Sequence, residues 1–486
     1  MDFLWTRGDR ATFRRQDAVG ELGNAPARAR RSELALLGYA IAVTAAGLTI
    51  VTSTLQSPGR PAVGAIVVLA AALLCAHGTV RRFAPDADPV LLPVAALLNG
   101  LGLVMIYRLG VSQEDTTLLN PGLAQLMWTV VGIGAFCGVL IAVRDHQIFA
   151  RYGYLCGSAG LLLLAIPAVL PAAVAEQNGA KLWIRLWGLS IEPAEFAKIL
   201  LIIFMSAVLV AKRDLFEYAG TRAAFLNLPR PRDLAPLAAA LIIAMIVMVF
   251  ETDLGAALLV YLTFLTMVYI ATARVGWVLI GIGVFAAASV VAYHIFRHVQ
   301  IRVHNWVDPF ADPDNTGYQM VQSMFSFATG GLMGTGLGQG QPELIPVASS
   351  DFITAAFGEE LGLVGLSAVV LLYGILTLRG LRTAIAVRDS FGKLLSAGLA
   401  TTLGLQVFLT VGGVTNLLPQ TGLTTPWLSY GGSSLVANYV LLAIVLRVSD
   451  AARRPVRSPR APGPALAEAR TEVIAAWAPA QAPRPS

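Results

Sequence analysis

Charged residues are scarce in this chain of 486 residues: Asp, Glu, Lys and Arg make up 13% of it, and 56% of the positions are hydrophobic. Soluble domains have about 25% charged residues, so the composition predicts a membrane protein. The formal net charge is +6, but the Lys and Arg residues gather in short segments between apolar runs and at the chain ends. No basic stripe with interleaved aromatic residues is present, which argues against nucleic acid as a partner.

Cysteine is scarce too. Cys75, Cys137 and Cys156 all fall in apolar runs, and their spacing matches no metal-binding motif, so we expect packing residues and no disulfide framework. The N-terminal segment lacks the early apolar stretch of a cleavable signal peptide. The sequence also lacks a Ser/His/Asp triad, a His-rich cluster and a zinc-protease motif.

Long apolar runs dominate the rest of the chain. A helix needs roughly 20 apolar residues to cross a bilayer, and about twelve segments qualify. They lie near residues 34–55, 61–79, 88–108, 121–144, 152–174, 192–211, 233–250, 253–272, 275–297, 350–378, 393–418 and 424–448. The sequence therefore predicts an all-α polytopic membrane protein.

The positions of Arg and Lys predict the orientation of these spans. With twelve spans, the basic connections all fall on one side, which we expect to be cytoplasmic. The expected parts are a cytoplasmic N-terminal tail (1–32), two spans (33–87), a ten-span core (88–449) and a disordered, Pro/Ala/Arg-rich cytoplasmic tail (450–486). Within the core, 298–349 forms a large extracytoplasmic loop, and loops of this length usually carry function.

The outside loop contains three carboxylates within seven residues, Asp308, Asp312 and Asp314. Such a group could supply a general base or gather a divalent cation. Asp, Pro, Asn and Gly are also ordinary turn residues, so a solvated turn remains an alternative.

Further along, Gly330 to Gly340 superficially matches a dinucleotide fingerprint. It lacks the strand and helix that such a site requires, and we interpret it as a pliable loop.

A pair of opposite charges begins one of the predicted spans. Pro193 suits the first turn of a helix, and Glu195 and Lys198, three residues apart, lie on one face of it. Charges inside a membrane are costly, so the pair is a functional hypothesis. The alternative is a salt bridge that only pins two helices together.

Several short motifs occur in the same order as in the SEDS family (shape, elongation, division and sporulation), whose members include RodA and FtsW, and over residues 88–448 the chain resembles that family. In chain order they are Trp183-Ile-Arg185, Glu192-Pro-Ala-Glu195 with Lys198, Asp253-Leu-Gly255, Asp312-Pro313, Gly317-Tyr318-Gln319, Gly336-Leu-Gly338, Asp351-Phe352, Gly358-Glu-Glu-Leu-Gly362 and Ser429-Tyr-Gly-Gly-Ser-Ser434. The chain is more similar to RodA-type than to FtsW-type members. It departs from the family pattern at Glu251-Thr252, where Gln-Pro is usual, and at Ser350, where a Thr preceded by His is usual.

The resemblance implies a glycosyltransferase that polymerises lipid II into peptidoglycan strands for elongation, cell shape or sporulation. Its catalytic aspartate would be Asp312, seven residues before Gln319. The implied substrate-binding residues are Lys181, Trp183, Arg185, Glu195, Lys198, Tyr318, Gln319, Glu360, Ser429 and Ser433. The implied partners are a class B penicillin-binding protein and the elongation or division machinery, in the inner membrane. A divalent cation, Mg²⁺ or Mn²⁺, is a candidate cofactor.

Two other functions remain open from the sequence. A flippase for the same lipid would also carry intramembrane charges, although no clear inverted repeat is visible. A non-catalytic scaffold for a transpeptidase would share the same spans.

Overall fold

The computed structural model describes residues 7–56, 59–112, 121–177, 180–186, 189–212, 220–223, 226–229 and 231–454. The predicted C-terminal tail beyond residue 454 therefore lies outside the described residues.

Helices account for nearly all the regular structure. Among the described residues, ten helices are long and apolar enough to cross a membrane, and two shorter apolar helices complete the twelve predicted spans. The long ones are α1 (Arg7–Thr54), α2 (Gly59–Phe83), α3 (Leu91–Ser112), α4 (Pro121–Ala142), α8 (Pro193–Ala211), α11 (Leu254–Thr272), α12 (Val275–Ile295), α15 (Ile353–Ala386), α16 (Ser390–Val414) and α17 (Gly432–Arg453). The shorter ones are α6 (Gly153–Val169) and α10 (Pro231–Phe250). The predicted all-α polytopic fold is confirmed.

The connections contain short elements. Three antiparallel hairpins pair β1 (Glu176–Gln177) with β2 (Ala180–Lys181), β3 (Ile184–Leu186) with β4 (Leu189–Ile191), and β5 (Gly220–Ala223) with β6 (Leu226–Pro229). The remaining helices are α5 (Gln147–Arg151), α7 (Ala172–Ala175), α13 (Arg297–Val307), η1 (Pro309–Ala311), α14 (Tyr318–Gly330) and η2 (Pro342–Leu344). The predicted outside loop thus contains two α-helices, α13 and α14.

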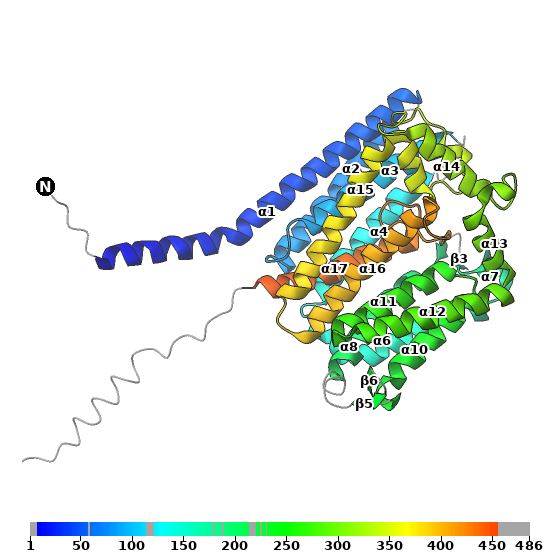
Figure 1. Ribbon diagram of the computed structural model, residues 1–486. Coiled ribbons are helices and arrows are strands. Elements are labelled where there is room, and N and C mark those ends of the chain that lie inside the picture. The colour runs from blue at the N-terminus through cyan, green and yellow to red at the C-terminus, as the bar shows by residue number, and fades with distance from the viewer. Residues whose placement is uncertain are drawn as a thin grey trace, which may run out of the picture.

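The helices form one bundle with two distinct ends (Figure 1). α13 and α14 lie at one end, and the last turn of α17 and the β5–β6 hairpin lie at the other. α1 projects beyond the bundle at that second end and already begins at Arg7, within the segment expected to be a tail. Both described chain ends therefore lie at the same end of the bundle, as an even number of crossings requires.

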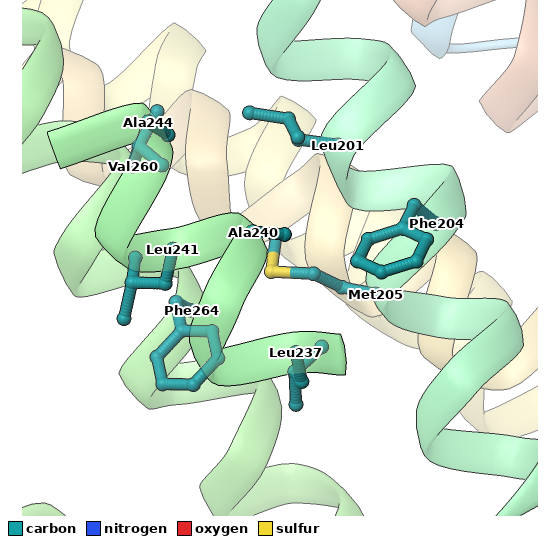
Figure 2. A pocket seen from close by; sticks show the side chains of 9 residues that line it. All are labelled: Leu201, Phe204, Met205, Leu237, Ala240, Leu241, Ala244, Val260 and Phe264. Carbon is teal, nitrogen blue, oxygen red and sulfur yellow. The ribbon is translucent and has the colours of Figure 1, made fainter. Parts of the chain in front are cut away.

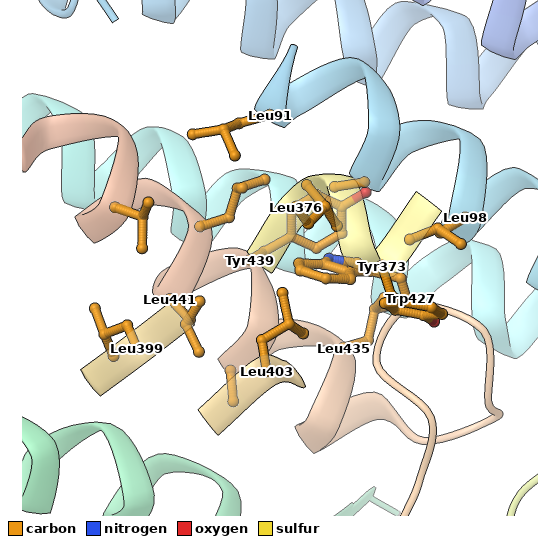
Figure 3. Packing of buried hydrophobic residues seen from close by; sticks show 14 of the residues in the cluster. Leu91, Leu98, Tyr373, Leu376, Leu399, Leu403, Trp427, Leu435, Tyr439 and Leu441 are labelled. Atoms are coloured by element: carbon orange, nitrogen blue, oxygen red, sulfur yellow. The ribbon is translucent and has the colours of Figure 1, made fainter. Parts of the chain in front are cut away.

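The packed centre of the bundle is formed by α3, α15, α16 and α17. Figure 3 shows Leu98 of α3 and Tyr373 of α15 near Trp427 and Tyr439, whose rings meet edge to face at 6.4 Å, and Leu403 of α16 in the same cluster. In the most apolar 18-residue stretch of α3 and of α17, 83% of the residues are buried. In the corresponding stretch of α12, none are buried. α12 is therefore a peripheral helix whose apolar surface faces outward.

A second apolar contact joins α8, α10 and α11. Figure 2 shows Leu201 and Met205 of α8 opposite Ala240 of α10 and Val260 of α11. The side chains that the three helices turn towards this contact are all apolar.

α15 is broken one quarter of the way along. Gly362 has φ +67° and ψ −172°, a conformation that suits only glycine. A Cβ atom there would lie 2.3 Å from the backbone N of Gly334, so the Gly-rich loop packs directly into the break. The backbone amides of Leu363 and Val364 donate to the carbonyls of Gly331 and Leu332. These contacts fix the Gly-rich loop to α15.

The end of α17 holds the linker between α2 and α3. Arg447 donates to the carbonyl of Phe83 at 2.6 Å, and the amide of Asp86 donates to the Asp450 carboxylate at 3.0 Å. The amide of Asp88 donates to the Ser449 hydroxyl at 3.1 Å. The first two helices are thereby tied to the last one.

Candidate active site

Asp312 lies at the outer-loop end of the bundle, between η1 and α14, and its side chain is partly exposed. Its carboxylate accepts hydrogen bonds from the Asn315 amide at 2.8 Å, the Thr316 backbone amide at 3.2 Å and the Thr316 hydroxyl at 3.0 Å. These donors, Asn315 first, hold the pKa of Asp312 below its ordinary value. Asp312 is therefore ionised and fixed in orientation.

The turn that carries Asp312 is anchored to α13. Asn305 of α13 donates to the carbonyl of Thr316 at 2.6 Å. A Cβ atom at Gly317 would lie 2.2 Å from the carbonyl oxygen of Pro309, so only glycine fits at this position. Asp308, by contrast, caps η1 by accepting from the Phe310 amide at 3.1 Å. Asp308 therefore stabilises the start of η1, whereas Asp312 accepts three hydrogen bonds from the turn that follows it.

Tyr318 and Gln319 follow at the start of α14 and face the segment that leads into α15. The Gln319 side chain donates to the carbonyl of Pro346 at 2.8 Å and accepts from Gln420 at 3.0 Å. The Tyr318 hydroxyl is 3.5 Å from the carbonyl oxygen of Leu344. Both residues therefore connect the Asp312 turn to neighbouring loops.

Glu195 and Lys198 form the ion pair that their spacing predicts, and each is only 5% exposed. The Lys198 ammonium also donates to the Gln406 side chain of α16 at 2.9 Å. The second Glu195 oxygen is 3.4 Å from the Thr424 hydroxyl, in the loop that precedes α17. The pair thus bridges α8, α16 and that loop.

Four further charges, all half-buried, lie just before three helices and on α13. They are Glu192 before α8, Asp253 before α11, Arg302 on α13 and Asp351 before α15. Arg302 donates to the carbonyls of Gln420 and Thr421 at 3.4 and 3.3 Å. The Asp253 carboxylate caps α11 by accepting from the Ala256 amide at 2.9 Å.

These charges influence one another. Burial raises the pKa of Asp351 to about 6, against the lowering effects of the Ser350 hydroxyl and the Arg302 charge. Burial also raises the pKa of Asp253, which Arg302 lowers in part, and that of Glu192, where the charges of Glu195 and Asp253 add to the effect. We call Glu192, Glu195, Lys198, Asp253, Arg302 and Asp351 the charge cluster.

Ser429 and Ser433 hold the start of α17 in place. The Ser429 hydroxyl donates to the Ser350 carbonyl at 2.6 Å and accepts from the Thr425 amide at 2.8 Å. The Ser433 hydroxyl accepts from the Glu192 amide at 2.9 Å. Ser429 therefore contacts the neighbour of Asp351, and Ser433 contacts Glu192, which belongs to the charge cluster.

Lys181 of β2 and Arg185 of β3 lie on the two hairpins between α6 and α8, and Trp183 lies between the hairpins. The Trp183 amide donates to the carbonyl of Ala175 at 3.4 Å, and Arg185 pairs across the hairpin with Ser190. β4 ends at Ile191, directly before Glu192. The hairpin thus connects these three residues to the charge cluster through the backbone.

Glu360 has a different environment. It forms an ion pair with Arg108 of α3, which is 1% exposed and also pairs with Glu343. The other Glu360 oxygen accepts from the Gly338 amide at 3.0 Å. The structure brings Glu360 to the Gly-rich loop, and its role in substrate binding stays a prediction.

The predicted site residues do not include Arg302, Gln406 or Glu192, although Glu192 belongs to one of the family motifs. Gln406 is a polar residue within an otherwise apolar span, and Arg302 lies ten residues before Asp312 in the outside loop. The sequence context of Gln406 and of Arg302 was therefore unusual, but only the folded chain shows which groups these two side chains face.

No group of three or more His, Cys, Asp or Glu side chains within the described part of the chain is placed to hold a metal ion. The predicted Mg²⁺ or Mn²⁺ stays a prediction, and no step below passes through it.

Comparisons with known proteins agree with this architecture. A family model described as "Cell cycle protein", which groups FtsW, RodA and SpoVE, matches residues 89–454. The chain belongs to this family, and the resemblance found in the sequence is confirmed.

Two mycobacterial relatives are similar over nearly their whole length. The chain is 60% identical over 468 residues to the peptidoglycan glycosyltransferase RodA of Mycobacterium tuberculosis H37Rv, covering 95% of this chain and 99% of the relative. It is 58% identical to the protein of the same name from Mycobacterium leprae, covering 92% and 96%.

The solved structures cover about three quarters of this chain. A chain in a study titled "Structural coordination of polymerization and crosslinking by a peptidoglycan synthase complex" is 28% identical, with a TM-score of 0.59; 76% of this chain and 99% of that one are covered. The Rod shape determining protein RodA of Thermus thermophilus, at 24% identity and a TM-score of 0.55, shows the same fold.

Proposed function

We propose that this membrane protein is a peptidoglycan glycosyltransferase that extends glycan strands from lipid II, with Asp312 as the group that accepts the proton of the attacking sugar hydroxyl. The observation that carries the proposal is the ionised Asp312 carboxylate, fixed at one end of a membrane bundle and open to solvent. The names of the mycobacterial relatives support the same activity.

In the proposed reaction, the acceptor oxygen bonds to the donor sugar as the bond from that sugar to the lipid diphosphate breaks. The hydroxyl proton passes to Asp312, and the electron pair leaves with the diphosphate. A carboxylate with a low pKa is a weak base. When a substrate displaces water and brings its own negative charge, both effects raise the pKa of Asp312 towards a value suited to the transfer.

The leaving diphosphate requires positive charge. Arg302 supplies one candidate, because its contacts with the Gln420 and Thr421 carbonyls are long enough to be exchanged for stronger bonds to phosphate oxygens. Lys198 supplies a second, deeper cation next to Gln406.

The proposal places both termini in the cytoplasm and the 298–349 loop outside. The polymerising end then faces the compartment where peptidoglycan lies, and the basic connections face the cytoplasm. A partner transpeptidase, a class B penicillin-binding protein, would be anchored in the same membrane. An open groove of about 360 Å³ between α15 and α16, lined by Gly374, Gly404 and Gly412, offers the small residues that favour close packing of a transmembrane helix.

Purified protein incubated with labelled lipid II tests the activity. Glycan ladders on a gel are expected. If the protein translocates lipid II in proteoliposomes but makes no ladders, it is a flippase and not a polymerase. If it shows neither activity, it is a non-catalytic scaffold. An Asp312→Asn preparation with an unchanged melting temperature is the matched control.

A further inference from the structure

The first two helices, α1 and α2, lie outside the residues that the family model matches. The family match begins at residue 89, and the solved relative is covered over 99% of its own length by 76% of this chain. The mycobacterial relatives, covered over 99% and 96% of their length, extend across this region. The α1–α2 hairpin is thus an addition to the shared core, and nothing proposed so far gives it a role.

The hairpin is packed tightly against the core. A Cβ atom at Gly100 of α3 would lie 1.9 Å from the Thr44 hydroxyl of α1, so the two helices touch through a glycine. At the inner end, Arg30 pairs with Glu33 and donates to the carbonyl of Ala87. His77 of α2 contacts the same glutamate at 2.7 Å. These contacts show a fixed attachment.

The outer end of the hairpin contacts the Gly-rich loop. Leu337 of that loop packs against a separate buried cluster, which we call the loop seat: Leu48 and Val51 of α1, Ala62 of α2, and Val104 and Tyr107 of α3. The adjacent Gly338 also faces the hairpin, because a Cβ atom there would lie 3.4 Å from Thr54. Three of the five loop-seat residues therefore lie outside the family core, and the other two belong to α3.

The Gly-rich loop is linked by further contacts to the Asp312 turn. Its backbone is held by α15: the Gly336 amide donates to the Glu360 carbonyl at 3.0 Å. The segment that follows carries Glu343, which pairs with the buried Arg108. It then supplies the Pro346 carbonyl that accepts from Gln319, seven residues after Asp312. A continuous chain of packed groups thus runs from the hairpin to the start of α14.

We propose that the α1–α2 hairpin positions the outer loop of the polymerase through the loop seat, with Leu48 and Leu337 as positioning residues. The hairpin touches no reacting atom. It fixes the Gly-rich loop, and through that loop the segment that supports Tyr318 and Gln319. This inference rests on the proposed function for its kinetic readout, but it also has a structural readout that needs no activity.

A matched pair of variants tests it in the full-length protein. Leu48 and Leu37 both lie on α1, and each is 1% exposed, but Leu37 packs in the main core away from the loop. Leu48→Ala and Leu37→Ala remove the same atoms, so we expect similar decreases in melting temperature. Only Leu48→Ala should lower kcat for lipid II polymerisation, by about tenfold, because small misplacements are costly in catalysis. KM should stay within about twofold, since the seat does not bind substrate.

Hydrogen exchange of the Gly-rich loop supplies the second readout. The amides of Thr335, Gly336 and Gly338 all donate to Glu359 or Glu360, and they should exchange faster in Leu48→Ala than in Leu37→Ala. If Leu48→Ala does not fold, Leu337→Ala replaces it, because Leu337 lies in the loop and is only partly buried. Leu337→Met should restore both readouts, as it conserves volume.

Equal kcat and equal loop exchange in the Leu48→Ala and Leu37→Ala variants would overturn the proposal and leave the hairpin as a stabilising addition only. If the wild-type protein makes no glycan, the proposed function fails, but the exchange comparison still decides whether the hairpin holds the loop.

Discussion

Replacing both Glu195 and Lys198 with apolar residues should leave the protein folded but inactive. The two side chains are 5% exposed and pair with each other, so losing one leaves a buried partner without its counter-charge. Removing one member of such a pair costs about 3–5 kcal/mol, whereas replacing both with packed hydrophobic groups is often nearly neutral. The loss of stability in Glu195→Leu should lie at the lower end of this range, because the Lys198 ammonium still donates to Gln406 at 2.9 Å.

The corresponding shifts in melting temperature are measurable. With an unfolding entropy of about 2 cal/mol/K per residue, a chain of this length has about 1 kcal/mol/K. Each single variant should therefore melt about 3–5 °C lower, and the Glu195→Leu/Lys198→Met double variant within about 1 °C of wild type. A charge-swapped Glu195→Lys/Lys198→Glu variant keeps the pair but moves the positive end.

Thermal unfolding in detergent and lipid II polymerisation, measured on the same preparations, check this prediction. The double and the charge-swapped variants should both be inactive, because neither presents an ammonium group next to Gln406. An active double variant would refute the reasoning and reduce the pair to a connection between α8, α16 and the loop before α17.

Three further predictions concern the outer loop and its surroundings. Asp312→Asn should abolish polymerisation and Asp308→Asn should reduce it less, because Asp308 only caps η1; equal losses in a gel assay would mean that the acids act jointly. In a cysteine-free background, an impermeant reagent applied to intact cells should label Asn315→Cys and spare Thr221→Cys; labelling at Thr221 would contradict the orientation. Burial raises the pKa of Glu251, which is 4% exposed, to about 8, with the Asp253 charge adding to the effect. The folded state therefore binds a proton that the unfolded state loses above about pH 4.5, and wild-type stability falls as pH rises to about 8. Glu251→Gln should match wild type near pH 4 and exceed it increasingly up to pH 8, and melting curves that differ equally at every pH would contradict this.

The spans were predictable because hydrophobic length is a local property. Twelve apolar segments appeared in the sequence, and twelve apolar helices form, ten of them long enough to cross a membrane on their own. Local chemistry also predicted the Glu195–Lys198 pair, since three residues along a helix bring two side chains together. The site residues beyond these local relations stay predictions, because no observation yet tests their roles.

Long-range partners could not be predicted in the same way. Nothing in the sequence indicates that Glu360 meets Arg108, 252 residues away, or that Arg302 of the outside loop faces Asp253 and Asp351. The break in α15 was equally hidden. Glycine at position 362 is compatible with an unbroken helix, and only the Gly-rich loop packed against it shows why the backbone turns there.

The hydrogen bonds between the end of α17 and the α2–α3 linker affect how the chain assembles during synthesis. Arg447 and Asp450 bond to Phe83 and Asp86 across 364 residues of sequence. A ribosome releases the first two spans long before it makes the groups that hold their linker. Those spans must remain in the bilayer, undocked at this point, until the twelfth has been inserted. A chain that stops short of Arg447 would therefore contain nearly every helix and still lack the bonds that close this end of the bundle.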